Sequence, residues 1–156
     1  MPARPDALPR PEPRPAAAVR RILLATDLSP ASEGATREAM YLARDLHASL
    51  LIVSVIEAGT APSGGSRVQR MDQRRAQREL AAQAVVVRGR EAGIQARFLV
   101  WEGEPGPAIV EAAAAEQVDM IVVGSHGRGT VGRLLLGSVS DHVIRNATAP
   151  VLVVRP

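Results

Sequence analysis

The sequence contains no cysteine and no lysine, and only three of its 156 residues are aromatic. Without cysteine the chain forms neither disulfide bonds nor thiolate metal sites. Without lysine it has no Walker A loop, because that phosphate-binding loop requires a lysine after its second glycine. Tyr41, Phe98 and Trp101 are too few to build the aromatic stacking platforms of many nucleic-acid-binding proteins. We therefore expect no nucleic-acid partner.

Long apolar runs and a strong net charge are also missing. No apolar run approaches the roughly 20 residues that span a bilayer, so we expect no membrane partner. The first residues alternate proline, arginine and alanine, unlike the continuous apolar region of a secretory signal. The net charge is only +3, from 19 arginines and 16 acidic residues. The pI is nevertheless 10.8, because arginine has a very high pKa, and the arginines are scattered among acidic residues. These features predict a cytoplasmic protein.

Composition divides the chain into two parts. Residues 1–18 contain six prolines separated by charged and small residues, which predicts a flexible, partly polyproline tail. A docking segment for a partner is the alternative reading of this tail. Residues 19–156 are long enough for one domain with a substantial core.

From Val19 onward, strand-like and helix-like patterns alternate. Ser29 and Pro30 predict the start of the first helix, as N-cap and first helical residue. Because residues 49–56 are apolar on both faces, they are typical of a parallel sheet covered on both sides. The predicted strands are 19–26, 49–56, 94–101, 118–123 and 151–154, and the later helices are 68–92, about 105–117 and a segment ending near 147. The pattern predicts a single three-layer α/β domain, a five-stranded parallel sheet with helices on both faces.

The long helix at 68–92 follows a segment, 57–66, whose glycines and proline predict a mobile loop. We expect Gly93 to end this helix. Its apolar side is predicted to contain Met71, Leu80, Ala84 and Val87. Its charged cluster is predicted to be a solvated face, formed by Arg70, Arg74, Arg75, Arg78 and Glu79.

Two strand ends mark a candidate site. Asp27 follows the first predicted strand and Gly124 follows the fourth, and open α/β sheets bind ligands at such carboxyl ends. The residues from Gly124 to Ser138 form a glycine-rich connection between a strand and a helix, an arrangement that binds phosphate. Glycines 127, 129 and 132 also fit a dinucleotide fingerprint. We interpret that match as accidental, because it follows the fourth strand and lacks the expected ribose carboxylate.

The full spacing, Gly124-x2-Gly127-x9-Gly137-Ser138, resembles the ATP-binding signature of the universal stress protein family. Three further segments are similar to the family in the same order. They are the opening strand at 21–29, the stretch at 122–129 that leads into Leu136–Ser140, and the last strand at 149–154. The resemblance covers about residues 19–156, which is everything except the tail.

This resemblance implies a sheet in the order 3-2-1-4-5, a bound ATP with Mg²⁺ carried by its phosphates, and a role in the stress response. Residues at the adenine and ribose end would be Thr26, Asp27 and Val55. Residues holding ribose and phosphates would be Gly124, Gly127, Gly137, Ser138, Val139 and Ser140, with Arg128 also able to reach phosphate. The family also implies a homodimer through the last strand, Val151–Val154. That strand would otherwise be an apolar, unpaired edge, which natural proteins cover or pair.

The residues support binding better than catalysis. The sequence offers no in-line general base and no carboxylate pair for magnesium, so we predict no catalytic residue and no protein metal site. We expect a regulatory module that reports nucleotide occupancy to a partner. The alternatives are a slow ATPase of the same superfamily and a nucleotide-free dimeric scaffold in which the glycines serve only turns and helix packing.

Overall fold

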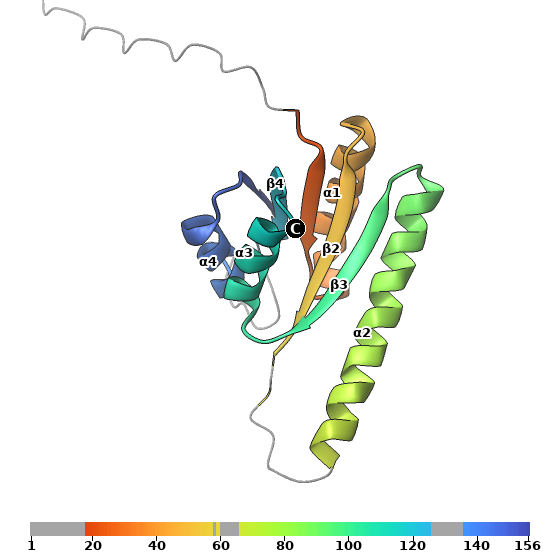
Figure 1. Ribbon diagram of the computed structural model, residues 1–156, viewed down its shortest axis with the longest axis vertical. Coiled ribbons are helices and arrows are strands. Elements are labelled where there is room, and N and C mark those ends of the chain that lie inside the picture. The colour runs from red at the N-terminus through yellow and green to blue at the C-terminus, as the bar shows by residue number, and fades with distance from the viewer. Residues whose placement is uncertain (1–17, 58, 60–65, 126–135) are drawn as a thin grey trace, which may run out of the picture.

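The computed structural model describes residues 18–57, 59, 66–125 and 136–156. The predicted tail, the centre of the loop predicted at 57–66, and the site residues Gly127 and Arg128 lie outside this part of the chain. Five parallel strands form one sheet in the order β3-β2-β1-β4-β5 (Figure 1), which confirms the predicted class and order. The strands are β1 (Arg21–Ala25), β2 (Ser49–Ile56), β3 (Ala96–Glu102), β4 (Met120–Gly124) and β5 (Val151–Val154).

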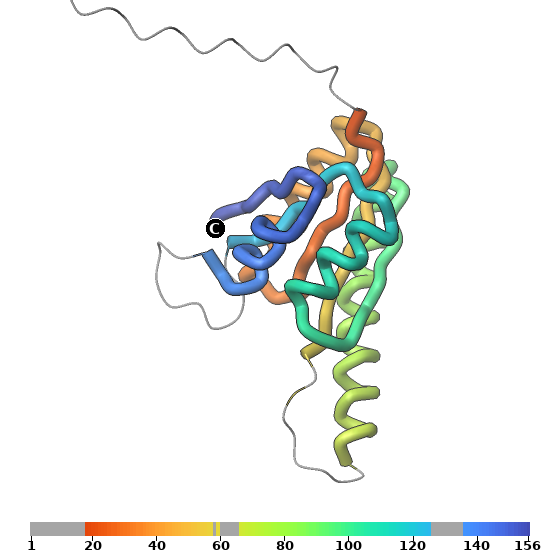
Figure 2. Tube along the Cα trace, turned by 60° about the vertical axis from the view of Figure 1, so that its left-hand side comes forward, coloured from red at the N-terminus to blue at the C-terminus, as the bar shows by residue number. Residues whose placement is uncertain are grey.

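Four α-helices cover the sheet in two layers (Figures 1 and 2). They are α1 (Glu33–Asp45), α2 (Ser66–Glu91), α3 (Pro105–Ala115) and α4 (Ser138–Asn146). Helices α1 and α2 pack on the face that contains Ile22, Leu24 and Ile52, whereas α3 and α4 pack on the face that contains Leu23 and Val53. Because β1 is covered on both faces, its residues 22–24 are completely buried.

The order of the strands places the switch point of the sheet between β1 and β4. The chain moves outward from β1 through β2 to β3, and then returns to pair β4 with the other side of β1. Ala25 pairs with Val123, so these two strands end side by side. Ligands of doubly wound sheets bind beyond the strand ends at such a point. Asp27 and Gly124 therefore lie at the carboxyl ends of two neighbouring strands, as the sequence predicts.

Element types agree with the sequence, and the boundaries differ by a few residues. The start of the first helix is an example. Ser29 precedes a short 3-10 turn, Pro30–Ser32, and α1 begins only at Glu33. The Ser29 side chain makes no capping hydrogen bond; instead, the Ser29 carbonyl accepts hydrogen bonds from the Ser32 backbone N–H and hydroxyl. Ser29 is thus the N-cap residue of the 3-10 turn and Pro30 its first residue, as predicted, but the Ser29 side chain does not cap and the α-helix begins three residues later.

The predicted apolar side of α2 is also wrong. Leu80 is 75% exposed and Val87 is 43% exposed. The buried side of α2 consists instead of small residues: Ala82, Val85, Val86 and Gly89. A Cβ added at Gly89 would lie 3.2 Å from the Ala96 Cβ, so this helix lies too close to β3 to place a leucine between them. Close packing selects small residues here and leaves the large ones outside.

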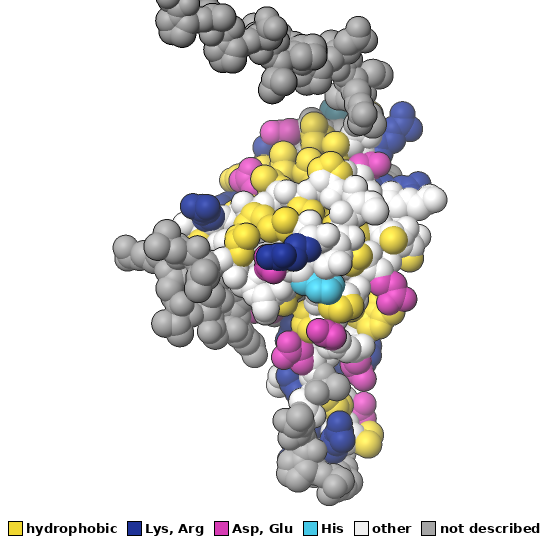
Figure 3. All heavy atoms as spheres, turned by 90° about the vertical axis from the view of Figure 1, so that its left-hand side faces the viewer, with side chains coloured by type: hydrophobic (Ala, Val, Ile, Leu, Met, Phe, Trp, Pro, Cys, Tyr) yellow, Lys and Arg dark blue, Asp and Glu magenta, His cyan; other side chains and the backbone are white. Residues whose placement is uncertain are grey.

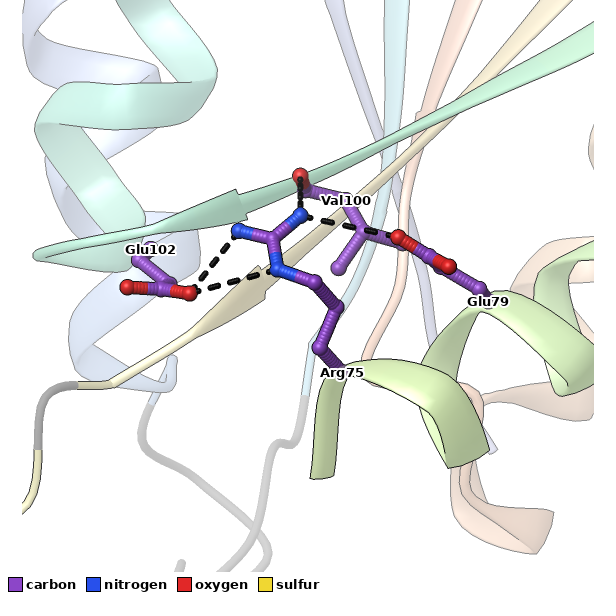
Figure 4. Close-up of polar contacts among 4 residues, drawn as sticks. All are labelled: Arg75, Glu79, Val100 and Glu102. Carbon is purple, nitrogen blue, oxygen red and sulfur yellow. Dashed lines mark hydrogen bonds and ion pairs between the residues drawn. The ribbon is translucent and has the colours of Figure 1, made fainter. Parts of the chain in front are cut away.

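The predicted solvated arginines of α2 are not all solvated. Arg75 donates two hydrogen bonds to Oε1 of Glu102 (2.8 and 3.3 Å) and a third to the Val100 carbonyl (3.3 Å), and it forms an ion pair with Glu79 (Figure 4). The hydrogen bonds that Arg75 donates to Glu102, with smaller contributions from Glu79, raise the pKa of Arg75 above its ordinary value. This arginine therefore attaches α2 to the end of β3.

Replacing Arg75 with methionine keeps the length and the apolar stem of the side chain but removes these contacts. We expect a loss of about 1 kcal/mol in the free energy of unfolding, because the partners are partly exposed and exposed ion pairs contribute little each. Urea unfolding followed by circular dichroism measures this loss. The control is Arg70→Met on the same helix, since Arg70 forms no ion pair among the described residues. Equal losses in the two variants would contradict the attachment.

None of the helices in the described residues is both long and apolar enough to cross a membrane.

Candidate functional site

A cavity of about 240 Å³ lies at the carboxyl ends of β1, β2 and β4. It brings together eight of the ten predicted site residues from four separate parts of the chain. These eight are Thr26, Asp27, Val55, Gly124, Gly137, Ser138, Val139 and Ser140. The other two, Gly127 and Arg128, lie outside the described residues.

The loop after β1 is held in one conformation by a series of hydrogen bonds. The Thr26 hydroxyl accepts from the Leu28 N–H (3.0 Å) and donates to the Ser32 hydroxyl (2.9 Å), which in turn donates to the Ser29 carbonyl. Asp27 Oδ1 accepts from the Ser29 N–H at 2.9 Å. Leu28 has a φ of 60°, a conformation that costs a residue with a Cβ roughly 1–2 kcal/mol. The network thus fixes a strained loop beside the cavity.

Helix α4 begins at the opposite wall of the cavity. Gly137 is its N-cap residue, and Ser138, Val139 and Ser140 form the first turn. The backbone N–H groups of a first turn have no acceptor within the helix, and they carry partial positive charge. Because the N-cap residue is glycine, no side chain at that position accepts a hydrogen bond from these N–H groups. These donors therefore provide an anion-binding position at the cavity.

Gly137 has a φ of −61° and a ψ of 155°, which any residue can adopt. A turn conformation that only glycine tolerates is therefore not the reason for glycine at this position. Gly137 lines the cavity at the start of α4. Its backbone is fixed by neighbours: its N–H donates to the Ser125 carbonyl (2.9 Å), and its carbonyl accepts from the Ser140 hydroxyl (2.9 Å).

The wall between these two loops is apolar. Val53 is buried and Val55 half-buried at the end of β2, and both face the layer of α3 and α4. Ile109 of α3 is buried against the same cluster and also lines the cavity. The cavity therefore offers a hydrophobic surface on which a flat ring could pack, between the polar groups of the β1 loop and those at the start of α4.

Sequence reasoning missed several lining residues. Glu57 follows β2, and Arg74 and Arg78 come from α2 on the other face of the sheet. Arg78 Nη1 donates to the hydroxyl of Ser54 at 2.8 Å, and Ser54 is completely buried in β2. Helical spacing places Arg74 and Arg78 on the same side of α2 as Val85 and Gly89, which are buried further along the helix. This spacing could have identified both arginines, but the charged cluster of this helix was assigned to solvent.

A second cavity, of about 450 Å³, lies at the opposite ends of β1, β2 and β3. Its charged side chains bind one another or backbone carbonyls. Arg97 forms an ion pair with Glu116, and this pairing lowers the pKa of the Glu116 carboxyl. Arg21 and Arg90 donate to the carbonyls of Glu116 and Ala96. Although this cavity is larger, it contains no predicted site residue and no start of a helix.

Across residues 18–57, 59, 66–125 and 136–156, no group of three or more His, Asp or Glu side chains is placed to hold a metal ion.

Comparisons with known proteins identify the family and the fold. The model of the universal stress protein family matches residues 18–155. A universal stress protein of Methanocaldococcus jannaschii is 32% identical over 139 residues, covering 87% of this chain and 82% of the relative. The solved structure of a universal stress protein from Lactobacillus plantarum superposes with a TM-score of 0.80 at 23% identity, covering 89% of this chain and 99% of that one.

A further solved structure is a universal stress protein in complex with cAMP. It has a TM-score of 0.66 and 26% sequence identity, and the match covers 89% of this chain and 98% of that chain. The match to the family model extends over nearly all of the residues that form the sheet, its helices and the cavity. The chain belongs to the universal stress protein family.

Proposed function

We propose that this protein is an ATP-binding regulatory module of the stress response, with one nucleotide site in the cavity beyond β1, β2 and β4. One observation carries the proposal: eight residues expected to contact ATP, from four segments of the chain, line a single cavity that includes the start of a helix. A relative in complex with cAMP supports an adenine nucleotide as the ligand class.

The lining residues fit the parts of ATP. The N–H groups at the start of α4, including that of Ser140, and the Ser138 hydroxyl would hold phosphate oxygens, each bond to a charged group contributing roughly 1.5–3 kcal/mol. The Ser140 hydroxyl itself donates to the Gly137 carbonyl. Val55 and Ile109 would contact adenine, and Asp27 would accept a ribose hydroxyl. Gly127 and Arg128 would complete the phosphate end. Mg²⁺ would be bound by the phosphates themselves, because the described residues provide no cluster of ligands for it.

We propose binding as the function and assign no catalytic residue. The described carboxylates at the cavity are Asp27 and Glu57. Asp27 Oδ1 accepts the Ser29 N–H, and the proposal assigns this carboxylate to the nucleoside end of the ligand. A bound nucleotide would therefore act without being converted. It would order the residues around the cavity and change a surface that a partner protein binds. A cytoplasmic location belongs to the same proposal.

Thermal unfolding with and without Mg-ATP tests the proposal, after removal of any co-purified nucleotide. At a ligand concentration about 100 times its Kd, the native state gains about 2.7 kcal/mol, which raises the Tm by about 5–10 °C for a chain of this size. A Tm that does not change at millimolar Mg-ATP, with no nucleotide in the purified protein, would reject the nucleotide site. It would favour a nucleotide-free scaffold.

The proposal includes a homodimer formed through β5. This strand lies at one edge of the sheet, and its four residues, Val151–Val154, are only half-buried. Hydrophobic side chains are also frequent on the side of the molecule that carries α4 and β5 (Figure 3). An exposed apolar edge of this kind is usually paired with another strand.

Val153→Pro tests the dimer. The carbonyls of Pro150 and Val154 accept bonds from the N–H groups of Ile121 in β4 and of Ser125 just after it, so the Val153 N–H points toward the free edge. Proline is tolerated in edge strands where the N–H faces outward, so the fold is retained while edge pairing is lost. Sedimentation at micromolar concentration should give twice the mass of 16.5 kDa for the wild type and a monomer for the variant. A monomeric wild type would reject the dimer.

A further inference from the structure

The side of α2 that faces the sheet is apolar in one half of the helix and carries arginines in the other. In its second half this side contains the buried Ala82, Val85 and Gly89. Toward the N-terminus the same side continues with arginines, Arg78, Arg74, Arg70 and Arg67, at intervals of four, four and three residues. The N-terminal part of the helix extends past the end of the sheet in both views (Figures 1 and 2). Arginine therefore replaces the apolar residues where the helix leaves the sheet and passes the cavity.

The two arginines nearest the sheet line the cavity itself. Arg78 is anchored, because its Nη1 donates to the buried Ser54 hydroxyl at 2.8 Å. Arg74 lies one turn further out, with its Nη1 3.8 Å from the position of a Cβ at Gly59, just after β2. Arg75 points elsewhere and is bound to Glu102, so it fixes the helix and does not line the cavity. Arg78 is thus bonded to β2, and Arg74 lies near Gly59, a residue just beyond the end of that strand.

The cavity consequently has two cationic ends. One is the start of α4 beside β4, which the proposed function assigns to the 5′-phosphates. The other is formed by Arg74 and Arg78 beside β2, and Glu57 is the carboxylate that lines the cavity there. Strand β1 lies between β2 and β4, so the ends are separated by two strand spacings, about 10 Å. Guanidinium groups match phosphate oxygens in geometry and charge.

We propose that Arg74 and Arg78 form a second phosphate subsite, so that the preferred ligand is an adenine nucleotide with a phosphate on its ribose 2′ or 3′ oxygen as well as at the 5′ position. This inference rests on the proposed nucleotide site and specifies its ligand. The added phosphate is a terminal monoester or a diester that continues to another nucleotide. Both present the same anionic oxygens to the arginines.

The test compares ligands that differ only in the added group. Calorimetric titration measures Kd for AMP, for adenosine 3′,5′-bisphosphate and for the dinucleotide pApA. We expect the bisphosphate to bind the wild type about tenfold more tightly than AMP, since one charged hydrogen bond contributes at least that factor. In Arg74→Gln the ratio should fall to between one and about threefold, while AMP binding is nearly unchanged. Tight binding of pApA would identify the diester as an accepted source, and weak binding would limit the subsite to a monoester.

Arg37→Gln is the matched control, because Arg37 is an exposed arginine on α1 that does not line the cavity. It should keep the full preference for the bisphosphate. Arg78→Gln provides a second variant, with circular dichroism to verify that loss of the bond to Ser54 leaves the fold intact. Equal affinities for AMP and the bisphosphate in the wild type would overturn the subsite and leave the ATP site standing. So would a preference that persists in Arg74→Gln. Failure of AMP, ATP and the bisphosphate to bind at all would overturn the proposed function as well.

Discussion

Gly106→Ala should destabilise the protein by about 1–3 kcal/mol, although alanine favours helices more than glycine does. Gly106 is the second residue of α3 and is buried against α4. An added Cβ would lie 2.7 Å from Cγ of His142 and 2.9 Å from its Cβ and Cδ2. The Cβ of His142 moves only with its helix, so the side chain cannot relieve the contact by rotating. Helix α4 must shift, and its first turn lines the cavity.

Gly34→Ala is the matched control, because Gly34 is the second residue of α1 and a Cβ there meets nothing within 4 Å. It should leave the free energy of unfolding unchanged or raise it by up to about 1 kcal/mol. Denaturant unfolding of the two variants gives the comparison, and ATP titration should show weaker binding only in Gly106→Ala. Indistinguishable stabilities would mean that α3 and α4 do not pack as closely as the structure indicates.

Ser138→Asp should weaken ATP binding without lowering the stability of the ligand-free protein. Ser138 is the first residue of α4, where a negative charge interacts favourably with the helix dipole, by about 0.3–1 kcal/mol. The same carboxylate would lie in the cavity beside the phosphates of a bound nucleotide. At a separation of about 4 Å, two like charges repel by roughly 1–4 kcal/mol near a protein surface. We expect ATP to bind about 10- to 100-fold more weakly, while the Tm of the ligand-free protein stays the same or rises.

Ser138→Asn has nearly the same shape as Ser138→Asp without the charge, so it should retain most of the affinity for ATP. Calorimetric titration of both variants, with a thermal scan of each, separates charge from bulk. If the aspartate and asparagine variants bind ATP equally, the start of α4 does not hold the phosphates.

The fold was largely predictable because its signals are local or are shared with a known family. Strand β5, Val151–Val154, lies between a proline and the chain end and agrees with its predicted bounds. The order of the strands came from the resemblance to the family and not from periodicity. The candidate site residues Thr26, Asp27 and Gly137 line the cavity. Their assignment came from the resemblance to the family, and for Asp27 also from its place at the carboxyl end of a predicted strand.

The packing of α2 was not predictable, because it depends on how closely the helix approaches the sheet. Periodicity assigns a leucine to the core and arginines to solvent, whereas Leu80 is exposed and Arg78 contacts the buried Ser54. The sequence also did not predict the left-handed backbone conformation of three described residues. Leu28, His47 and Gln117 adopt positive φ angles that sequence reasoning reserves for glycine. Gly93, by contrast, ends α2 with a φ of 81°, as predicted.

The most direct test of the nucleotide site is the change in backbone amide NMR shifts on addition of ATP to nucleotide-free protein. The proposed site predicts the largest changes at the β1 loop, the end of β2 and the first turn of α4, at Thr26, Asp27, Val55, Gly124, Gly137, Ser138, Val139 and Ser140. It predicts small changes at the opposite ends of the strands, near Ser49 and Gln95. Saturating changes that cluster around Gln95 and Arg97, or no changes at millimolar ATP, would contradict the account.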